Sequence, residues 1–206
     1  MPDILTAITS SNGQDSAYDE LYREYLDNRT LFLNNEIDEN VIEDYIMYIL
    51  KWNKEDMNLP RESRKPIKLF ISSPGGNVFD SNIFVNVIES SKTPIIGIAL
   101  DIVASASFHI YIACHERIAF SDSAFLIHDG EIAVENSRKK AKDTMAFFDE
   151  GDIRLKNHIL RHTNIDEEFY ESIYESEFWY YAQRGKELGV VHKIVGEDVD
   201  LDYILL

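Results

Sequence analysis

Two residues, Ser105 and His128, have the types and settings needed for nucleophilic chemistry. Ser105 lies in the small-residue segment from Ala104 to Ser107, at the expected start of a buried helix. Free backbone amides and the positive end of the helix dipole favour an anionic reaction centre there. His128 closes the apolar segment "AFLI", and an imidazole is a common base for a serine hydroxyl. Each residue also has a plainer interpretation, Ser105 as a helix N-cap and His128 as a structural histidine.

A glycine-containing turn forms the third candidate feature. The sequence Ser-Pro-Gly-Gly at residues 73–76 directly follows a short apolar segment, and nothing charged occurs until Asp80. Glycine leaves a backbone N–H open to an approaching oxyanion, where a side chain would block it. The N–H of Ala106, next to the candidate serine, is a possible second donor. The plainer interpretation of the turn is a tight link between a strand and a helix.

The other histidines have weaker settings for catalysis. His109 is four residues after Ser105 and shares its helical face, but a residue on the same helix rarely points its ring at a hydroxyl in the first turn. The remaining four are expected at surface or helix-end positions: His115, His158, His162 and His192. Cys114 adjoins His115 and no second cysteine exists, so a cysteine-based zinc site is not predicted.

Composition narrows the class of protein. The 206 residues are 45% hydrophobic, which suits a mobile N-terminal segment (1–16) followed by one domain (17–206). A net charge of −17 argues against a nucleic-acid partner, and the basic run at 138–142 fits a solvated helix face. No apolar run is long enough to span a membrane, no signal peptide is evident, and the single cysteine fits a reducing compartment. We therefore expect a cytoplasmic protein without a membrane partner.

Alternating strand and helix patterns predict an α/β fold with a mainly parallel sheet. The expected strands are short and apolar, and lie from 30 to about 34–35, at 67–72, at 93–100, within 116–128 as a pair around a turn, and at 190–195. The expected helices are amphipathic or buried, and lie at 19–26, 38–55 with Asp38 as N-cap, 80–92, 101–113, 137–163, 166–176 and 181–189 with Gly189 as C-cap. Ligands of such sheets bind at the carboxyl ends of the strands, where all three candidate segments are expected.

The order of these segments resembles the ClpP family, the proteolytic subunit of the Clp protease. The carrying motifs are "ISSPGGNV", then "IVASASF", then "AFLIHDG", followed by "YAQRGKELGVVHKIV". The resemblance extends from Ser16 to Val195 and implies a ClpP/crotonase-like fold with a protruding handle helix at about 137–163. The separation of 23 residues between Ser105 and His128 is closer to the ClpP-like peptidases of phages and prophages.

Site residues follow from the resemblance, position by position. Ser105 matches the nucleophile and His128 the general base, while Gly76 and Ala106 match the two positions whose amides form the oxyanion hole. Glu177 occupies the place of the family's third triad member, an aspartate shortly before a Phe-x-Ser-Ala run, here "FWYYA". A glutamate is able to orient a histidine and stabilise its imidazolium, because triads with glutamate exist on other folds.

Several positions depart from the family pattern. Glu175 competes with Glu177 for the acid's role, and Asp129, directly after the base, is a poorer candidate. Asp101 replaces a glycine near the site, and Ser107 stands where the family has a glycine after the nucleophile segment. These changes bear on substrate preference and activity more than on the fold.

The resemblance implies a serine endopeptidase that uses no cofactor or metal and works inside an oligomeric chamber. Family members stack as two heptameric rings, and an AAA+ unfoldase ATPase feeds them unfolded polypeptides. The chain itself has no phosphate-binding G-x-x-x-x-G-K-[ST] motif. Two alternatives stay open: a catalytically weak ring subunit with an assembly role, and a crotonase-type acyl-CoA enzyme.

Overall fold

A computed structural model describes residues 16–130 and 137–205 of the chain. In this part of the chain seven strands form one sheet, in the order β1-β2-β3-β4-β7, with β5 paired to β3 and β6 paired to β5. Every pairing is parallel except that of β5 with β6. The strands are β1 (Thr30–Leu33), β2 (Ile67–Ser73), β3 (Ile95–Ala104), β4 (Glu116–Ala119), β5 (Ala124–Ile127), β6 (Phe178–Tyr181) and β7 (Lys193–Ile194).

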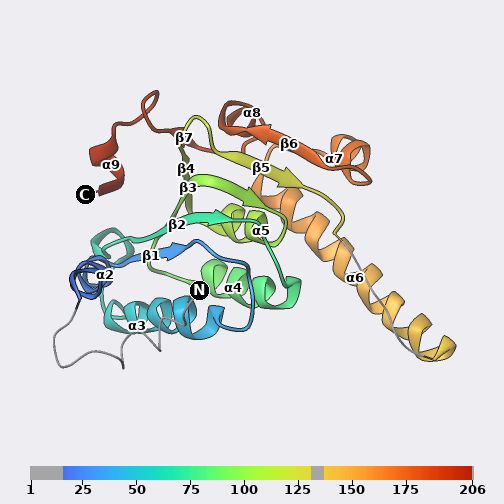
Figure 1. Ribbon diagram of the computed structural model, residues 1–206, viewed down its shortest axis with the longest axis horizontal. Helices are drawn as coiled ribbons and strands as arrows, with labels where there is room; N and C mark the ends of the chain where they lie inside the picture. The colour runs from blue at the N-terminus through green and yellow to red at the C-terminus, as the bar shows by residue number, and fades with distance from the viewer. Residues whose placement is uncertain (1–15, 131–136, 206) are drawn as a thin grey trace.

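Helices connect the strands, and the predicted α/β class with a mainly parallel sheet is confirmed. The helical segments are α2 (Ala17–Asp27), the π-helical turn η1 (Ile42–Ile46), α3 (Met47–Glu55), the 3₁₀ turn η2 (Arg61–Ser63), α4 (Val78–Ser90), α5 (Ala106–Ala113), α6 (Arg138–His162), α7 (Glu167–Ile173), α8 (Ala182–Glu187) and α9 (Leu201–Leu205). The long helix predicted at 137–163 is α6, which extends well beyond the other elements (Figure 1).

The apolar core lies on both faces of the sheet. Alternate residues of β2, such as Leu69 and Ile71, join the larger cluster with the buried faces of α3, α4 and α5. Phe70 points the other way and packs with Ile204 of α9 in a smaller cluster. This burial on two faces is the arrangement expected of a parallel sheet, and it explains why its strands are almost wholly apolar.

Strand β3 changes its partner halfway along. Its first half pairs with β4, and residues 102–104 pair with β5. The register with β2 runs from Ile71 opposite Ala99 to Ser73 opposite Val103, so β3 holds two more residues than β2 over that interval. Such a bulge bends the strand. The bend places the carboxyl end of β3 beside the carboxyl end of β5.

Some predicted boundaries were wrong. The helix expected from Asp101 begins at Ala106, because residues 101–104 extend β3 and carry its ladder with β5. Asp38 does not cap the next helix: its carboxylate accepts the N–H of Asn40 in a local turn, and the helix starts later, at Ile42.

Other features of the chain's ends and turns were either confirmed or not foreseen. Gly189 has φ of +69° just past α8, as expected of a C-cap glycine. Strand β6 and helix α9 were not predicted. Of the N-terminal segment predicted at 1–16, all but Ser16 lies outside the described residues.

A buried ion pair fixes the start of β1 to the end of α3. Two N–H groups of the Arg29 guanidinium donate to the two carboxylate oxygens of Asp56, at 2.6 and 2.9 Å. The hydroxyl of Thr93, just before β3, donates to the same carboxylate at 2.9 Å. The hydrogen bonds from Arg29 lower the pKa of Asp56. Hydrogen-bond donors from the start of β1 and from the segment before β3 both point at this carboxylate at the end of α3, and they favour its charged form.

We expect Asp56→Asn to lower the free energy of unfolding by about 3 kcal/mol, because it leaves the Arg29 charge buried without its partner. The folded-state pKa of Asp56 is lowered, so its contribution is complete above the ordinary aspartate pKa of about 3.9 and is lost as the pH falls below it. Urea unfolding at pH 7 and at pH 3 measures both effects.

Glu55 provides the matched control. It also contacts Arg29, at 3.3 Å, but its side chain is 48% exposed. Glu55→Gln should therefore change the unfolding free energy by less than about 1 kcal/mol. Equal losses for the two variants at pH 7 would show that burial of the Asp56 pair is not what stabilises this junction.

Candidate active site

Ser105 forms the single-residue turn between β3 and α5. Its backbone has φ of 55° and ψ of −124°, a conformation that non-glycine residues rarely adopt. The N–H of Ser105 donates to the carbonyl oxygen of Leu126 in β5, at 3.2 Å. Strained residues of this kind gather at functional sites, where the surrounding structure holds them. Among the described residues other than glycine, Arg29 and Ser105 have a positive φ, and Ser105 is the one at the carboxyl edge of the sheet.

The two glycines of the 73–76 turn are each required by a close approach. A Cβ on Gly75 would lie 2.7 Å from both the Cβ of Ser105 and the carbonyl oxygen of Ala104, and its φ is +102°. A Cβ on Gly76 would lie 2.3 Å from the carbonyl oxygen of Ile37, and its φ is +144°. Gly75 thus lets the turn press directly against the candidate nucleophile, while Gly76 packs on the segment after β1.

The amides of Gly76 and Ala106 are placed as potential donors. The Ile37 N–H donates to the carbonyl of Gly75 and the Asn77 N–H donates to the carbonyl of Ile37, both at 2.8 Å, so this bridge does not use the N–H of Gly76. Ala106 is the first residue of α5, where an N–H has no partner within the helix. The N–H of Ala106 directly follows Ser105 in the chain, and the N–H of Gly76 directly follows Gly75, which contacts Ser105.

Ser107 has a structural role that the sequence did not reveal. Its side chain is fully buried, and its hydroxyl accepts the N–H of Ala104 at 2.9 Å. The hydroxyl proton faces the carbonyl oxygens of Ser73 and Ala104, each at 2.8 Å. The hydroxyl therefore ties the end of β2 to the end of β3. Where the family pattern has a glycine, this chain has a serine whose hydroxyl links two strand ends, which we call the Ser107 clamp.

His128 follows β5 at the same edge of the sheet as Ser105. The parallel pairing of Ala104 with Leu126 sets Ser105 and His128 just beyond neighbouring strand ends. The Nε2 atom of His128 is buried and has no hydrogen-bond partner among the described residues. The structure thus brings the two residues to one edge without joining them by a hydrogen bond. Catalytic hydrogen bonds are often loose before substrate binds.

His109 packs away from the sheet, toward α6. Its ring centroid lies 5.8 Å from that of His158. Burial, and then the charges of His158 and His128, lower the pKa of His109 to about 3, so it is neutral at pH 7. His158, expected at a surface or helix-end position, lies about one turn before the end of α6 but is buried and not at the surface. Its Nε2 bonds to the carbonyl oxygen of His109 at 3.0 Å.

Glu177 lies next to His128 in the register of the antiparallel pair β5–β6. The last paired residues are Ile127 and Phe178, so His128 and Glu177 occupy the following position on their strands. Opposed residues of antiparallel strands have Cβ atoms about 4.5–5.5 Å apart. The Glu177 carboxylate is exposed and accepts the indole N–H of Trp179 at 3.1 Å.

The other acids considered for the site, Asp101, Asp129 and Glu175, are also exposed. Within the described residues no hydrogen bond joins His128 to any of these acids, and none joins it to Glu177. Position in the strand register therefore distinguishes Glu177 from its competitors.

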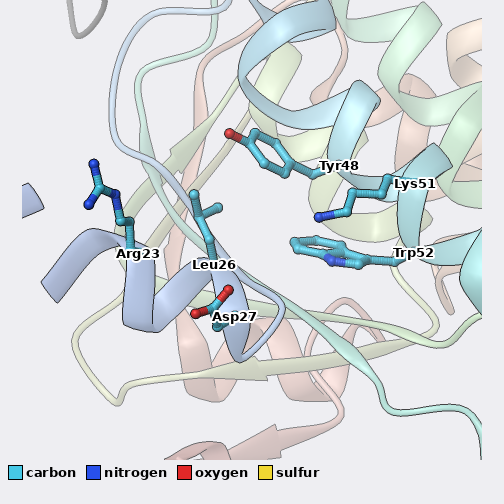
Figure 2. A pocket seen from close by; sticks show the side chains of 6 residues that line it. All are labelled: Arg23, Leu26, Asp27, Tyr48, Lys51 and Trp52. Carbon is cyan, nitrogen blue, oxygen red and sulfur yellow. The ribbon is translucent and has the colours of Figure 1, made fainter. Parts of the chain in front are cut away.

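The cavity drawn in Figure 2 lies away from Ser105. It measures about 180 Å³ and sits between α2 and α3, with the Trp52 indole and the Leu26 side chain facing it. Its other lining residues are Arg23, Asp27, Tyr48 and Lys51. None of the predicted site residues lines it, so it does not serve as the substrate pocket of this site.

No helix within residues 16–130 or 137–205 has the length and apolar character needed to cross a bilayer.

Comparisons with known proteins agree with this fold. The chain is 23% identical to the ATP-dependent Clp protease proteolytic subunit 2 of Treponema denticola over 185 residues, which cover 89% of this chain and 90% of that protein. It is 25% identical to the proteolytic subunit 3 of a Synechococcus species over 173 residues, covering 81% and 82% of the two chains.

A solved structure of a ClpP1 mutant from Listeria monocytogenes superposes with a TM-score of 0.70 at 22% identity, covering 89% of this chain and 99% of that one. The predicted ClpP/crotonase-like fold is confirmed, while the narrower likeness to phage proteins stays a prediction. The family model described as Clp protease matches residues 12–198. The chain therefore belongs to the Clp protease family.

Proposed function

We propose that this chain is a serine endopeptidase subunit that hydrolyses peptide bonds with Ser105 as nucleophile and His128 as general base. The observation that carries the proposal is the strained turn at Ser105, at the same sheet edge as His128. A serine with only a structural role gains nothing from a backbone of positive φ, which costs energy and must be held in place by the neighbouring strands. The Nε2 of His128 is buried and has no hydrogen-bond partner within residues 16–130 and 137–205, which supports the same conclusion, since such an atom calls for a functional explanation.

In the proposed reaction the Ser105 hydroxyl attacks the carbonyl carbon of the substrate while His128 Nε2 accepts its proton. The carbonyl oxygen becomes an oxyanion, which the N–H groups of Gly76 and Ala106 receive. His128 then gives the proton to the departing amine, and the peptide C–N bond breaks. Water, deprotonated by His128, hydrolyses the resulting ester and restores Ser105. Loss of one oxyanion donor typically costs about 10²–10³ in kcat.

The third catalytic member in this proposal is Glu177. A carboxylate that accepts the Nδ1–H of His128 fixes the tautomer in which Nε2 faces the serine, and it stabilises the imidazolium. The strand register supports this role. Its present partner, the Trp179 indole, would then be exchanged for His128.

Assembly into stacked heptameric rings, fed by an AAA+ unfoldase ATPase, is part of the proposal. Along α6 the side chains of Met145, Phe147 and Ile153 are 41%, 59% and 59% exposed. Phe79 of α4 stacks on Phe147 with a centroid separation of 6.1 Å, so the apolar surface continues onto the body. Surfaces of this kind mark interfaces. The single buried cysteine, Cys114, supports a cytoplasmic setting.

A catalytically weak ring subunit is the second candidate. It is favoured by the bond of Glu177 to Trp179 and by the absence of a bond between Ser105 and His128 in the described residues. The two candidates differ in whether the parent protein hydrolyses peptides.

We expect Ser105→Ala to abolish hydrolysis of a fluorogenic peptide, a loss of about 10⁴-fold or more, and to abolish labelling by a fluorophosphonate. Light scattering should give the variant the same mass as the parent. Persistent labelling of the variant would contradict the assignment of Ser105. A parent protein without labelling or hydrolysis would favour the weak ring subunit.

We expect Gly75→Ala to reduce peptide hydrolysis by about 10²-fold, because the added methyl displaces Ser105 and misplacement of a reacting group by about 1 Å has that cost. Gly196→Ala is the control. Gly196 also has a positive φ, +88°, but a Cβ there meets nothing within 4 Å. If both variants lose activity equally, general backbone strain rather than contact with Ser105 explains the effect.

We expect Glu177→Gln to lower kcat by about 10³–10⁴-fold while circular dichroism and oligomer mass stay unchanged, since an amide stabilises an imidazolium poorly. Glu175→Gln should retain nearly full activity. The reverse result would transfer the role to Glu175. Full activity in both variants would mean that the site works as a Ser-His pair or takes its acid from Asp101 or Asp129.

A further inference from the structure

A cluster of three potential metal ligands lies where the base of α6 meets the end of α4. His158 and His162 are four residues apart on α6 and so share one face of the helix. Glu89 reaches them from α4: its Oε1 lies 2.8 Å from Nε2 of His162 and 3.3 Å from Nδ1 of His158. The three ligand atoms all lie within 4.8 Å of one another. None of these residues takes part in the proposed peptidase chemistry.

The hydrogen bond of His158 sets which of its nitrogens is free. Its Nε2 lies 3.0 Å from the carbonyl oxygen of His109, and a carbonyl oxygen only accepts, so Nε2 carries the proton. The Arg161 Nη2 group, which only donates, lies 3.5 Å from Nδ1, as it does beside a neutral ring whose lone pair is on Nδ1. Metal-ligating histidines almost always donate their other N–H to a carbonyl or carboxylate in this way, which fixes the ring and its tautomer.

A lone pair and a carboxylate 3.3 Å apart repel each other, and a cation between them relieves this repulsion. In this structure Arg161 is that cation: its Nη2 lies 3.2 Å from Glu89 Oε1 and 3.5 Å from His158 Nδ1. The Arg161 side chain is 63% exposed, so it is free to swing into solvent.

We propose that Glu89, His158 and His162 bind one divalent zinc-class cation, which displaces Arg161 and the proton that His162 Nε2 now donates to the Glu89 carboxylate. Two imidazole nitrogens and one carboxylate oxygen are a ligand set that suits zinc, with water in the fourth position. Zinc–nitrogen bonds of about 2.0–2.1 Å place tetrahedral ligand atoms about 3.3 Å apart, and the two Glu89–histidine spacings of 2.8 and 3.3 Å are close to that value. The metal would fasten the base of α6 to α4.

The test uses the full chain, freed of metal by dialysis against a chelator and titrated with zinc alone by calorimetry. We expect one equivalent per chain, and with cobalt the visible absorption of a tetrahedral site. His162→Asn and Glu89→Gln should each weaken zinc binding by about 100-fold or more, since loss of a second-shell partner alone costs about 10–100-fold. Arg161→Gln should bind zinc more tightly than the parent, because the competing cation is removed.

His192→Asn is the matched control. His192 is exposed, and its Nδ1 accepts a backbone N–H, which an asparagine oxygen replaces. This variant should bind zinc as the parent does. Equal affinity of the parent and His162→Asn would overturn the proposal, as would a loss in His192→Asn as large as that in His162→Asn. Thermal unfolding of each metal-free variant shows whether a lost signal reflects a missing ligand or a lost fold. His162→Asn is the decisive change, because His162 is only half-buried and its replacement disturbs the fold less than that of the buried His158.

Discussion

The backbone of Ser105 is the constraint on which the centre of this molecule depends. A serine held in a sparsely populated conformation costs about 1–3 kcal/mol, and the surrounding structure must supply that energy. One restraint comes from β5, whose Leu126 carbonyl accepts the Ser105 N–H. A second comes from the buried Ser107 hydroxyl, which bonds to backbone atoms of both Ser73 and Ala104. A third is helix α4, where the Ser81 hydroxyl donates to the Ala106 carbonyl at 2.8 Å.

These restraints explain why the sheet is built as it is. Strand β3 leaves β4 and joins β5 within a few residues. Strand β5 both accepts the Ser105 N–H and leads into His128. The bulge in β3 makes that exchange possible. Gly75 of the 73–76 turn then closes the site from the β2 side, because no residue with a side chain fits against Ser105 there.

Much of this was predictable from the sequence, and the failures have physical causes. Apolar runs, caps and the long amphipathic pattern located the strands, Gly189 and α6 because those signals are local. Residues 101–104 were assigned to a helix because an apolar segment of small residues suits a buried strand equally well, and only pairing with β5 decides between them. The same holds for β6, whose aromatic run becomes a strand through its partner. The Ser107 clamp and the buried setting of His158 depend on contacts between distant segments, which no single-sequence pattern carries.

The way α6 is anchored has a consequence for how the protein responds to its own concentration. This helix has 25 residues and so is about 37 Å long, yet its buried residues are His158 and Ile159, both near its C-terminal end. An isolated helix gains little stability in water, and the half of α6 before His158 adds the partly exposed contact of Phe147 with Phe79 but no buried residue. In the proposed ring assembly, helix formation there is linked by mass action to the neighbouring subunit that covers it. Dilution of that assembly should loosen the far turns of α6 long before the sheet that carries Ser105 begins to unfold.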